Sequence, residues 1–189
     1  MKLIFDIEAN GLLPHQLTEE IKQEATVIWC IVALDSKGNL YKFRPNQIKE
    51  GVELLKSADT LIGHNIIGFD IPAIKKICGV DLYKYCKIID TLTMSQLCNP
   101  VRDKGHSLKA WGGKLNFTKD EHEDFTKFSQ AMLDYCVKDV KINKKVYKIL
   151  KQESKDFSSQ SLHLEHHIRN IVSKQIENGF AFDSKKASI

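Results

Sequence analysis

The stretch "FDIEANGL", residues 5–12, places two carboxylates, Asp6 and Glu8, inside a run that otherwise has the pattern of a buried strand. Side chains alternate between the two faces of a strand, so Asp6 and Glu8 share one face with Lys2 and Ile4. Two like charges held this close repel each other, which makes a divalent cation their natural partner. The alternative is that both acids simply end an edge strand in solvent, where carboxylates are common.

Strand and helix patterns alternate along the rest of the chain. The periodicity predicts strands at 3–7, 25–34, 40–44, 60–65 and 87–90. It predicts helices at 48–56, 69–78, 91–97, 107–115, 129–150 and 161–177. The turn "DSKGN" at 35–39 joins the second and third strands as a hairpin, and Ser107 is a helix cap. This alternation predicts a mixed α/β fold.

Composition predicts an ordinary globular protein. The 189 residues are 42% hydrophobic and 28% charged, with a formal net charge of +4, which suffices for one domain with a sizeable core. The longest apolar run, 27–34, is too short to cross a bilayer, and Met1 is followed at once by a strand pattern. We therefore expect no membrane association and a cytoplasmic location. Five cysteines without a C-x-x-C pair indicate reduced thiols, mostly in the core.

Two further acids lie on predicted helices. In "GHNIIGFD", Asp70 follows a buried strand and begins a helix, where it is either a hard oxygen ligand or a helix cap. In "YCVKD", Tyr135 and Asp139 are stacked four residues apart on one helical face. The alternatives for these two are an amphipathic core tyrosine and a solvated helix charge.

The ordered set of motifs resembles a known family. "DIE" at 6–8, "HNIIGFD" at 64–70 and "YCVKD" at 135–139 look like the three exonuclease motifs of the DEDD superfamily. Tyrosine stands four residues before the last aspartate, which matches the tyrosine branch; the position that is histidine in the sister branch is Asp134 here. "SLKAWGGKL" at 107–115 and "QIENGFAFD" at 175–183 are similar to segments of the proofreading domain in family A DNA polymerases of short-tailed phages.

This resemblance implies a ribonuclease H-like fold, a mixed central sheet flanked by helices, with 3′-to-5′ exonuclease activity. In such enzymes the carboxylate matching Asp6 bridges two Mg²⁺ ions, and those matching Glu8 and Asp139 complete the site of the nucleophile-side ion. The residue matching Asp70 supports the second ion, and the one matching Tyr135 orients the attacking water. Four acids with no cysteine among them suit Mg²⁺, or Mn²⁺ as a substitute, better than zinc.

The same resemblance implies a pocket for the 3′-terminal nucleotide, lined by Ala9, Asn10, Gly11, Leu12 and Asn65. A core leucine and a turn asparagine explain Leu12 and Asn65 almost as well. Among the basic stretches, the loop 102–106, "RDKGH", is the one that we expect to contact phosphates.

The sequence "HLEHH" places His163 and His167 four residues apart, with His166 beside them. That spacing occurs in zinc sites, but no second ligand group accompanies it, so a solvated helix surface is favoured. Trp111 is expected in the core.

Residues 1–152 are thus expected to form the exonuclease domain. Residues 153–189 are expected to form a helical segment that would lead into a polymerase domain absent from this chain, a partner supplied in cis or in trans. The predicted function is metal-dependent removal of nucleotides from single-stranded DNA 3′ ends, in proofreading during replication, within a bacterial or phage-infected cell. The alternatives are an RNA-trimming exonuclease of the same superfamily and a catalytically silent domain that binds nucleic acid or a replication partner. A silent domain has no need to hold repelling acids together.

Overall fold

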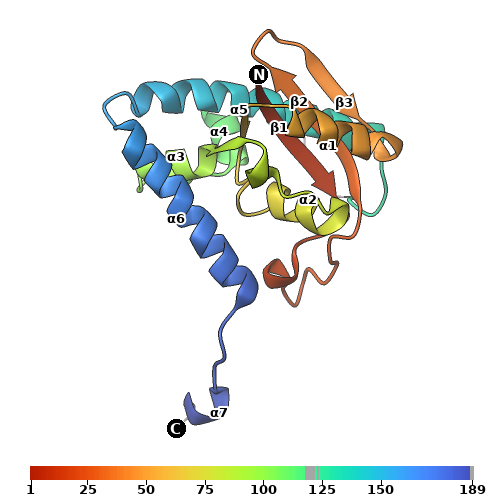
Figure 1. Cartoon of the computed structure of the whole chain (residues 1–189), viewed down its shortest axis with the longest axis vertical. Helices are drawn as coiled ribbons and strands as arrows, with labels where there is room; N and C mark the ends of the chain where they lie inside the picture. Colours follow the sequence, from red (N-terminus) through yellow and green to blue (C-terminus); the bar gives the residue numbers. More distant parts are fainter. Residues whose placement is uncertain (118–121, 123, 188–189) are drawn as a thin grey trace.

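A five-stranded mixed sheet forms the centre of the molecule in a computed structural model that describes residues 1–117, 122 and 124–187 (Figure 1). Its strands lie in the order β3-β2-β1-β4-β5. They are β1 (Lys2–Ala9), β2 (Ile28–Asp35), β3 (Leu40–Phe43), β4 (Thr60–Gly63) and β5 (Lys87–Asp90). β1 pairs antiparallel with β2 and parallel with β4, so the strand that carries Asp6 and Glu8 is central rather than at an edge. The predicted α/β class with a mixed sheet is confirmed.

Helices cover both faces of this sheet. The helices of the described residues are α1 (Ile48–Lys56), α2 (Asp70–Cys78), α3 (Thr91–Cys98), α4 (Leu108–Lys114), α5 (Gln130–Glu153), α6 (Ser159–Asn178) and the short α7 (Ser184–Ala187). Three single-turn 3₁₀ helices, η1 (Pro14–Gln16), η2 (Pro45–Gln47) and η3 (Leu82–Lys84), lie in the connections. The helices α1 and α2 pack on one face and α5 packs on the other, while α3 and α4 pack on the second half of α5.

The alternation of side chains along β1 separates the two cores. Leu3, Phe5 and Ile7 point into the cluster under α1 and α2, whereas Ile4 points into the cluster under α5. Because Asp6 and Glu8 follow Ile4 at intervals of two, the strand aims both acids at the α5 side.

The second strand begins later than the sequence predicts. Residues 25–27 pair with the loop after β1 instead of with the sheet, because Ala25 N–H donates to Leu12 O and Asn10 N–H donates to Val27 O. The register of β1 against β2 shifts between Glu8 and Ala9, so the regular pairing of the two strands is interrupted directly after the second acid.

Other local predictions are confirmed. Ser107 caps α4 by accepting a backbone N–H bond, and Trp111 is buried in the core, both as predicted. Ser129, which was not predicted as a cap, caps α5 in the same way. Within the described ranges, no helix is both long and apolar enough to cross a membrane.

The chain ends in α6 and α7. Figure 1 shows α6 beside α3, with its end and α7 extending away from the sheet. Of the predicted C-terminal segment 153–189, residues 188 and 189 lie outside the described residues.

Candidate active site

All four predicted acids and the predicted tyrosine line one cavity of about 430 Å³. Asp6 and Glu8 come from β1, Asp70 is the first residue of α2, and Tyr135 and Asp139 come from α5. The cavity therefore gathers side chains from three elements that are far apart in sequence. Such convergence is what a site for a small charged ligand requires.

Two of the alternatives left open by the sequence are wrong. Asp139 is only 6% exposed, so it is not a solvated helix charge. Asp70 is only 3% exposed, and the N-cap of α2 is Phe69, so Asp70 does not act as the helix cap. Instead, its Oδ1 accepts a bond of 3.2 Å from the backbone N–H of Ile7. That bond ties the start of α2 directly to β1 between the two acids of that strand.

Asp90 shapes the loop that leads to Asp70, a role that the sequence analysis missed. Its Oδ1 accepts from the N–H groups of Asn65 (3.0 Å) and Leu92 (2.8 Å), and its Oδ2 accepts from the N–H of Ile67 (3.0 Å). One buried carboxylate thus caps α3 and holds the loop of residues 64–69 at the end of β5. The available signal was an aspartate directly before a predicted helix, a common capping position.

The acids raise one another's pKa values. Burial, followed by the charges of Asp70, Glu8 and Asp139, raises the pKa of Asp6 well above its usual range. Burial, followed by the charges of Asp90 and Asp139, raises the pKa of Asp70 to about 8, against the lowering effect of the N–H bonds that it accepts. Carboxylates in this state are stabilised by added positive charge, which a divalent cation supplies.

The donor set fits hard divalent ions such as Mg²⁺ or Mn²⁺. Ligand atoms of Asp6, Glu8 and Cys136 lie within 4.8 Å of one another. Burial, together with a hydrogen bond involving Cys30, raises the pKa of the Cys136 thiol well above its usual range, so the sulfur keeps its proton. The thiol lies 3.4 Å from Asp6 Oδ2, to which it donates, and this leaves oxygen atoms as the ligands.

The contact between Cys136 and Asp6 was not predicted. The sequence indicated that the cysteines are core thiols, and Cys136 is indeed fully buried. Its position, between Tyr135 and Asp139 on the helix, was the available signal, since a residue three before Asp139 lies on the same side of the helix.

A second cavity, of about 550 Å³, adjoins the first; Glu8, Phe69 and Phe125 line both. Four of the five predicted nucleotide-binding residues line this second cavity, and the fifth lines the first. The four are Ala9, Asn10, Gly11 and Leu12, and the fifth is Asn65.

Two of these residues also have clear structural tasks. The Oδ1 of Asn10 accepts from the N–H groups of Thr26 and Val27, and its amide donates to the hydroxyl of Thr26. A Cβ atom on Gly11 would lie 2.2 Å from the carbonyl oxygen of Gln23, so only glycine fits there. These contacts hold the wall of the second cavity in place.

Phe125 stands where the two cavities meet, and sequence reasoning missed it. Its ring packs edge-on against Tyr135, with centroids 6.4 Å apart. Trp29 Nε1–H donates to the carbonyl oxygen of Phe125 at 2.9 Å and so fixes its backbone. The segment around Phe125 has neither helical nor strand periodicity, which left no signal in the sequence.

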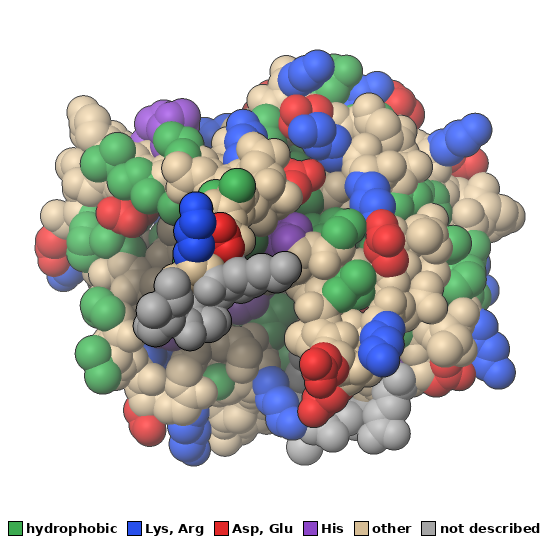
Figure 2. Space-filling model, turned by 90° about the horizontal axis from the view of Figure 1, so that it is seen from below, with side chains coloured by type: hydrophobic (Ala, Val, Ile, Leu, Met, Phe, Trp, Pro, Cys, Tyr) green, Lys and Arg blue, Asp and Glu red, His purple; other side chains and the backbone are tan. Residues whose placement is uncertain are grey.

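The prediction that the loop 102–106 contacts phosphates is wrong for Arg102. Its guanidinium pairs with Glu153 at 2.5 Å and lies over the ring of Trp111, so that only 5% of the side chain is exposed. His106 bonds to the hydroxyl of Ser95. Figure 2 shows the Lys and Arg side chains of one face interspersed with Asp and Glu rather than gathered in a patch.

The histidine cluster divides into two parts. His163 and His167 are exposed and their rings stack at 6.4 Å, as predicted for a solvated surface. The prediction is wrong for His166, whose Nε2 accepts a bond of 2.8 Å from the backbone N–H of Asp90. That bond attaches α6 to the end of β5.

Comparisons with known proteins show what the chain as a whole is similar to. No family model matches the chain. Its sequence is similar to the DNA-directed DNA polymerases of Enterobacteria phage T3 (25% identity) and Escherichia phage T7 (24%), over 97% of this chain and 34% of each polymerase. The chain thus spans about a third of the length of these relatives. The resemblance seen in the motifs is confirmed.

Solved structures resemble it along most of its length. Brucella melitensis NrnC with bound Mg²⁺ matches with a TM-score of 0.60 at 19% identity, covering 94% of this chain and 82% of that one. The catalytic core of RRP6 from Trypanosoma brucei matches with a TM-score of 0.62 at 13% identity, over 91% and 46%. The zinc-bound complex of E. coli ExoI with single-stranded DNA matches with a TM-score of 0.53 at 15% identity, over 82% and 41%. The chain therefore has the ribonuclease H-like fold that its motifs predict, in a sequence similar to phage DNA polymerases.

Proposed function

We propose that this chain is a metal-dependent 3′-to-5′ exonuclease that removes nucleotides from the 3′ ends of single-stranded DNA. The observation that carries the proposal is the convergence of Asp6, Glu8, Asp70, Asp139 and Tyr135 on one cavity. The similarity to two DNA polymerases, and to structures determined with Mg²⁺ or with single-stranded DNA, supports it.

Asp6, Glu8, Asp70 and Asp139 would hold two Mg²⁺ ions. Asp6 is the acid on which the charges of the other three act together, which makes it the central member of the set. Two bound ions would stabilise the entering and leaving oxygens of an in-line displacement at phosphorus. The protein's own task is to keep four repelling carboxylates together, which it does by building them on a central strand and two packed helices.

Tyr135 would position the attacking water. It lies one helical turn before Asp139 and borders the cavity, so its hydroxyl can reach the space beside that carboxylate. The ring of Phe125 packs against it and limits its motion. The thiol of Cys136 donates a hydrogen bond to Asp6 and so orients the carboxylate on which the mechanism depends most.

The second cavity would receive the terminal nucleoside. Apolar and aromatic side chains, among them Leu12, Phe69 and Phe125, line it beside Glu8. Aromatic surfaces stack on any base, which suits an enzyme that acts without regard to sequence. A strand whose last nucleotide must enter the second cavity while its phosphate lies in the first has to be unpaired at its end, and this favours single-stranded substrate.

The biological role that we propose is proofreading in DNA replication. Residues 1–152 would form the exonuclease domain, and residues 153–189 would connect it with a polymerase domain, in cis or in trans. The similarity to the phage polymerases over nearly the whole chain supports this role.

The test is digestion of one single-stranded DNA oligonucleotide labelled either at its 3′ end or at its 5′ end, with Mg²⁺ or with EDTA, beside an RNA of the same sequence. The proposal predicts that Mg²⁺ releases 3′-labelled mononucleotide at once and shortens the 5′-labelled strand stepwise, with none of this in EDTA. Faster digestion of the RNA would favour RNA trimming. Binding of the strand without any cleavage would favour the silent domain.

A further inference from the structure

The helix α6 touches the candidate active site through one polar face. His166, Arg169 and Ser173 occupy positions i, i+3 and i+7, which lie on the same side of an α-helix. Each of the three makes a hydrogen bond to the loop between β4 and α2 or to the end of β5. Most large apolar side chains of α6, among them Leu164, Ile168 and Ile171, are exposed instead, and none of its residues is fully buried. Polar contacts, rather than burial of an apolar face, therefore connect α6 to the site.

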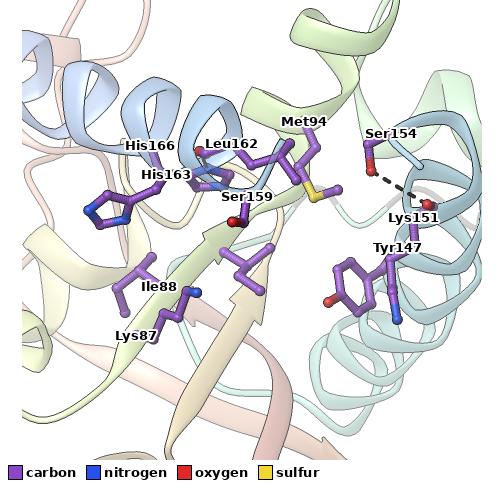
Figure 3. A pocket seen from close by; sticks show the side chains of 11 residues that line it. Lys87, Ile88, Met94, Tyr147, Lys151, Ser154, Ser159, Leu162, His163 and His166 are labelled. Atoms are coloured by element: carbon purple, nitrogen blue, oxygen red, sulfur yellow. Dashed lines mark hydrogen bonds between the residues drawn. The ribbon is translucent and has the colours of Figure 1, made fainter. Parts of the chain in front are cut away.

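His166 makes the first contact. Its Nδ1 lies 2.6 Å from the carbonyl oxygen of Leu162, to which it donates, so that Nε2 is left to accept from the N–H of Asp90. Figure 3 shows His166 projecting from α6 beside the β5 residues Lys87 and Ile88, on the wall of a cavity between this strand and the helix. The same Asp90 holds the loop with its carboxylate, so His166 secures α6 to the residue that shapes the loop.

Arg169 and Ser173 hold the loop itself. Arg169 Nη2 donates to Asn65 Oδ1 at 3.5 Å, and the hydroxyl of Ser173 donates to the carbonyl oxygen of Ile67 at 3.2 Å. Asn65 has a left-handed backbone (φ 61°), and a Cβ on Gly68 would lie 2.5 Å from its Oδ1. The side chain of Asn65 is thus confined between Gly68 and the guanidinium.

We propose that Arg169 is a positioning residue of the exonuclease and that α6 supports the loop 64–69 through hydrogen bonds additional to those made by the carboxylate of Asp90. This inference rests on the proposed function. Asn65 lines the catalytic cavity, and the loop ends at Asp70. The hydrogen bonds from α6 to the loop therefore help to determine the positions of the Asn65 side chain and the Asp70 carboxylate. The segment after residue 152 then contributes to the exonuclease site in addition to any connecting role.

A double-mutant cycle on the full chain tests this. We compare Arg169→Ala, Asn65→Ala and the double variant for kcat/KM on a single-stranded DNA oligonucleotide with Mg²⁺. Arg169→Ala should lower kcat/KM about tenfold, through the position of Asn65, so the double variant should be no slower than Asn65→Ala alone. The matched control, Lys174→Ala, removes an exposed charge from the same helix and should match the wild type. Full activity of Arg169→Ala, or additive losses in the double variant, would overturn the inference.

Hydrogen exchange separates this inference from the proposed function. In Arg169→Ala, the amides of Asn65 and Ile67 should exchange about tenfold faster than in the wild type and in Lys174→Ala, whether or not the protein cleaves DNA. An inactive wild type would refute the exonuclease proposal alone. Unchanged exchange at these two amides would refute the proposal that Arg169 helps to hold the loop 64–69.

Discussion

Replacing Asp70 by asparagine should abolish activity and yet stabilise the protein in the absence of metal. The carboxyl group is 3% exposed, and burial and neighbouring charges raise its pKa from 3.8 to about 8. Asparagine has nearly the same shape and retains an oxygen that can accept the N–H of Ile7. The substitution therefore removes the cost of keeping this carboxyl group protonated in the folded protein and keeps the hydrogen bond.

The sign and size of the effect follow from proton linkage. Between pH 3.8 and about 8 the folded protein holds a proton on Asp70 that the unfolded chain has released, so the free energy of unfolding falls as the pH rises through this range. At pH 7 the penalty is at most about 4 kcal/mol, at 1.36 kcal/mol for each unit of pKa. For a chain of this length, Asp70→Asn should raise Tm in EDTA by roughly 10 °C at pH 7 and by little at pH 4.

Thermal unfolding in EDTA between pH 4 and pH 8, repeated with saturating Mg²⁺, measures this change in Tm. Mg²⁺ should stabilise the wild type and should stabilise Asp70→Asn much less, because a ligand is missing. The matched control is Asp90→Asn, which removes the same charge from a buried carboxylate that accepts several backbone N–H groups. It should destabilise the protein by about 2 kcal/mol, since one oxygen is lost. If Asp70→Asn is no more stable than the wild type at pH 7 in EDTA, the argument that burial and neighbouring charges make Asp70 destabilising is wrong.

Substitutions at four other positions separate the roles of residues in and around the site. Tyr135→Phe should lower kcat about 100-fold with little change in KM, while Asp6→Ala should leave no measurable cleavage by a folded protein; equal losses in single-turnover rates would contradict the assignment. Cys136→Ala should weaken Mg²⁺ binding, measured by titration calorimetry, roughly tenfold, and Cys136→Ser should restore it, because a hydroxyl can donate to Asp6. Gly11→Ala should lower the free energy of unfolding by about 2 kcal/mol, because the added methyl group clashes with the backbone of Gln23. An unchanged urea midpoint would contradict this and would mean that the loop shifts to accommodate the methyl group.

The periodicity of the sequence predicted the sheet and most helices because its apolar positions are regular. The helix 48–56 and the strand 87–90 have the predicted bounds. The second strand starts late because residues 25–27 pair with a loop near the acids, an interaction between distant segments that no local pattern encodes. Hydrophobic alternation also placed Asp6 and Glu8 on one face, and the structure has that arrangement.

The less predictable parts of the site depend on contacts between distant segments. Phe125 reaches the cavity from an irregular segment. The side chains of Asp90 and His166 accept hydrogen bonds from backbone N–H groups of distant residues, and such pairings cannot be read from a sequence. Arg102 was expected to contact phosphates, but it is paired with Glu153 at the end of α5. A charged residue in a glycine-containing loop does not reveal whether it has an internal partner.

The most direct test of the central claim is an anomalous difference map from crystals soaked with Mn²⁺ and a deoxynucleoside monophosphate. The account predicts two peaks between the carboxylates of Asp6, Glu8, Asp70 and Asp139, with the nucleotide phosphate beside them and the base in the cavity lined by Leu12. A well-ordered protein at saturating Mn²⁺ with no peak among these four side chains would contradict it.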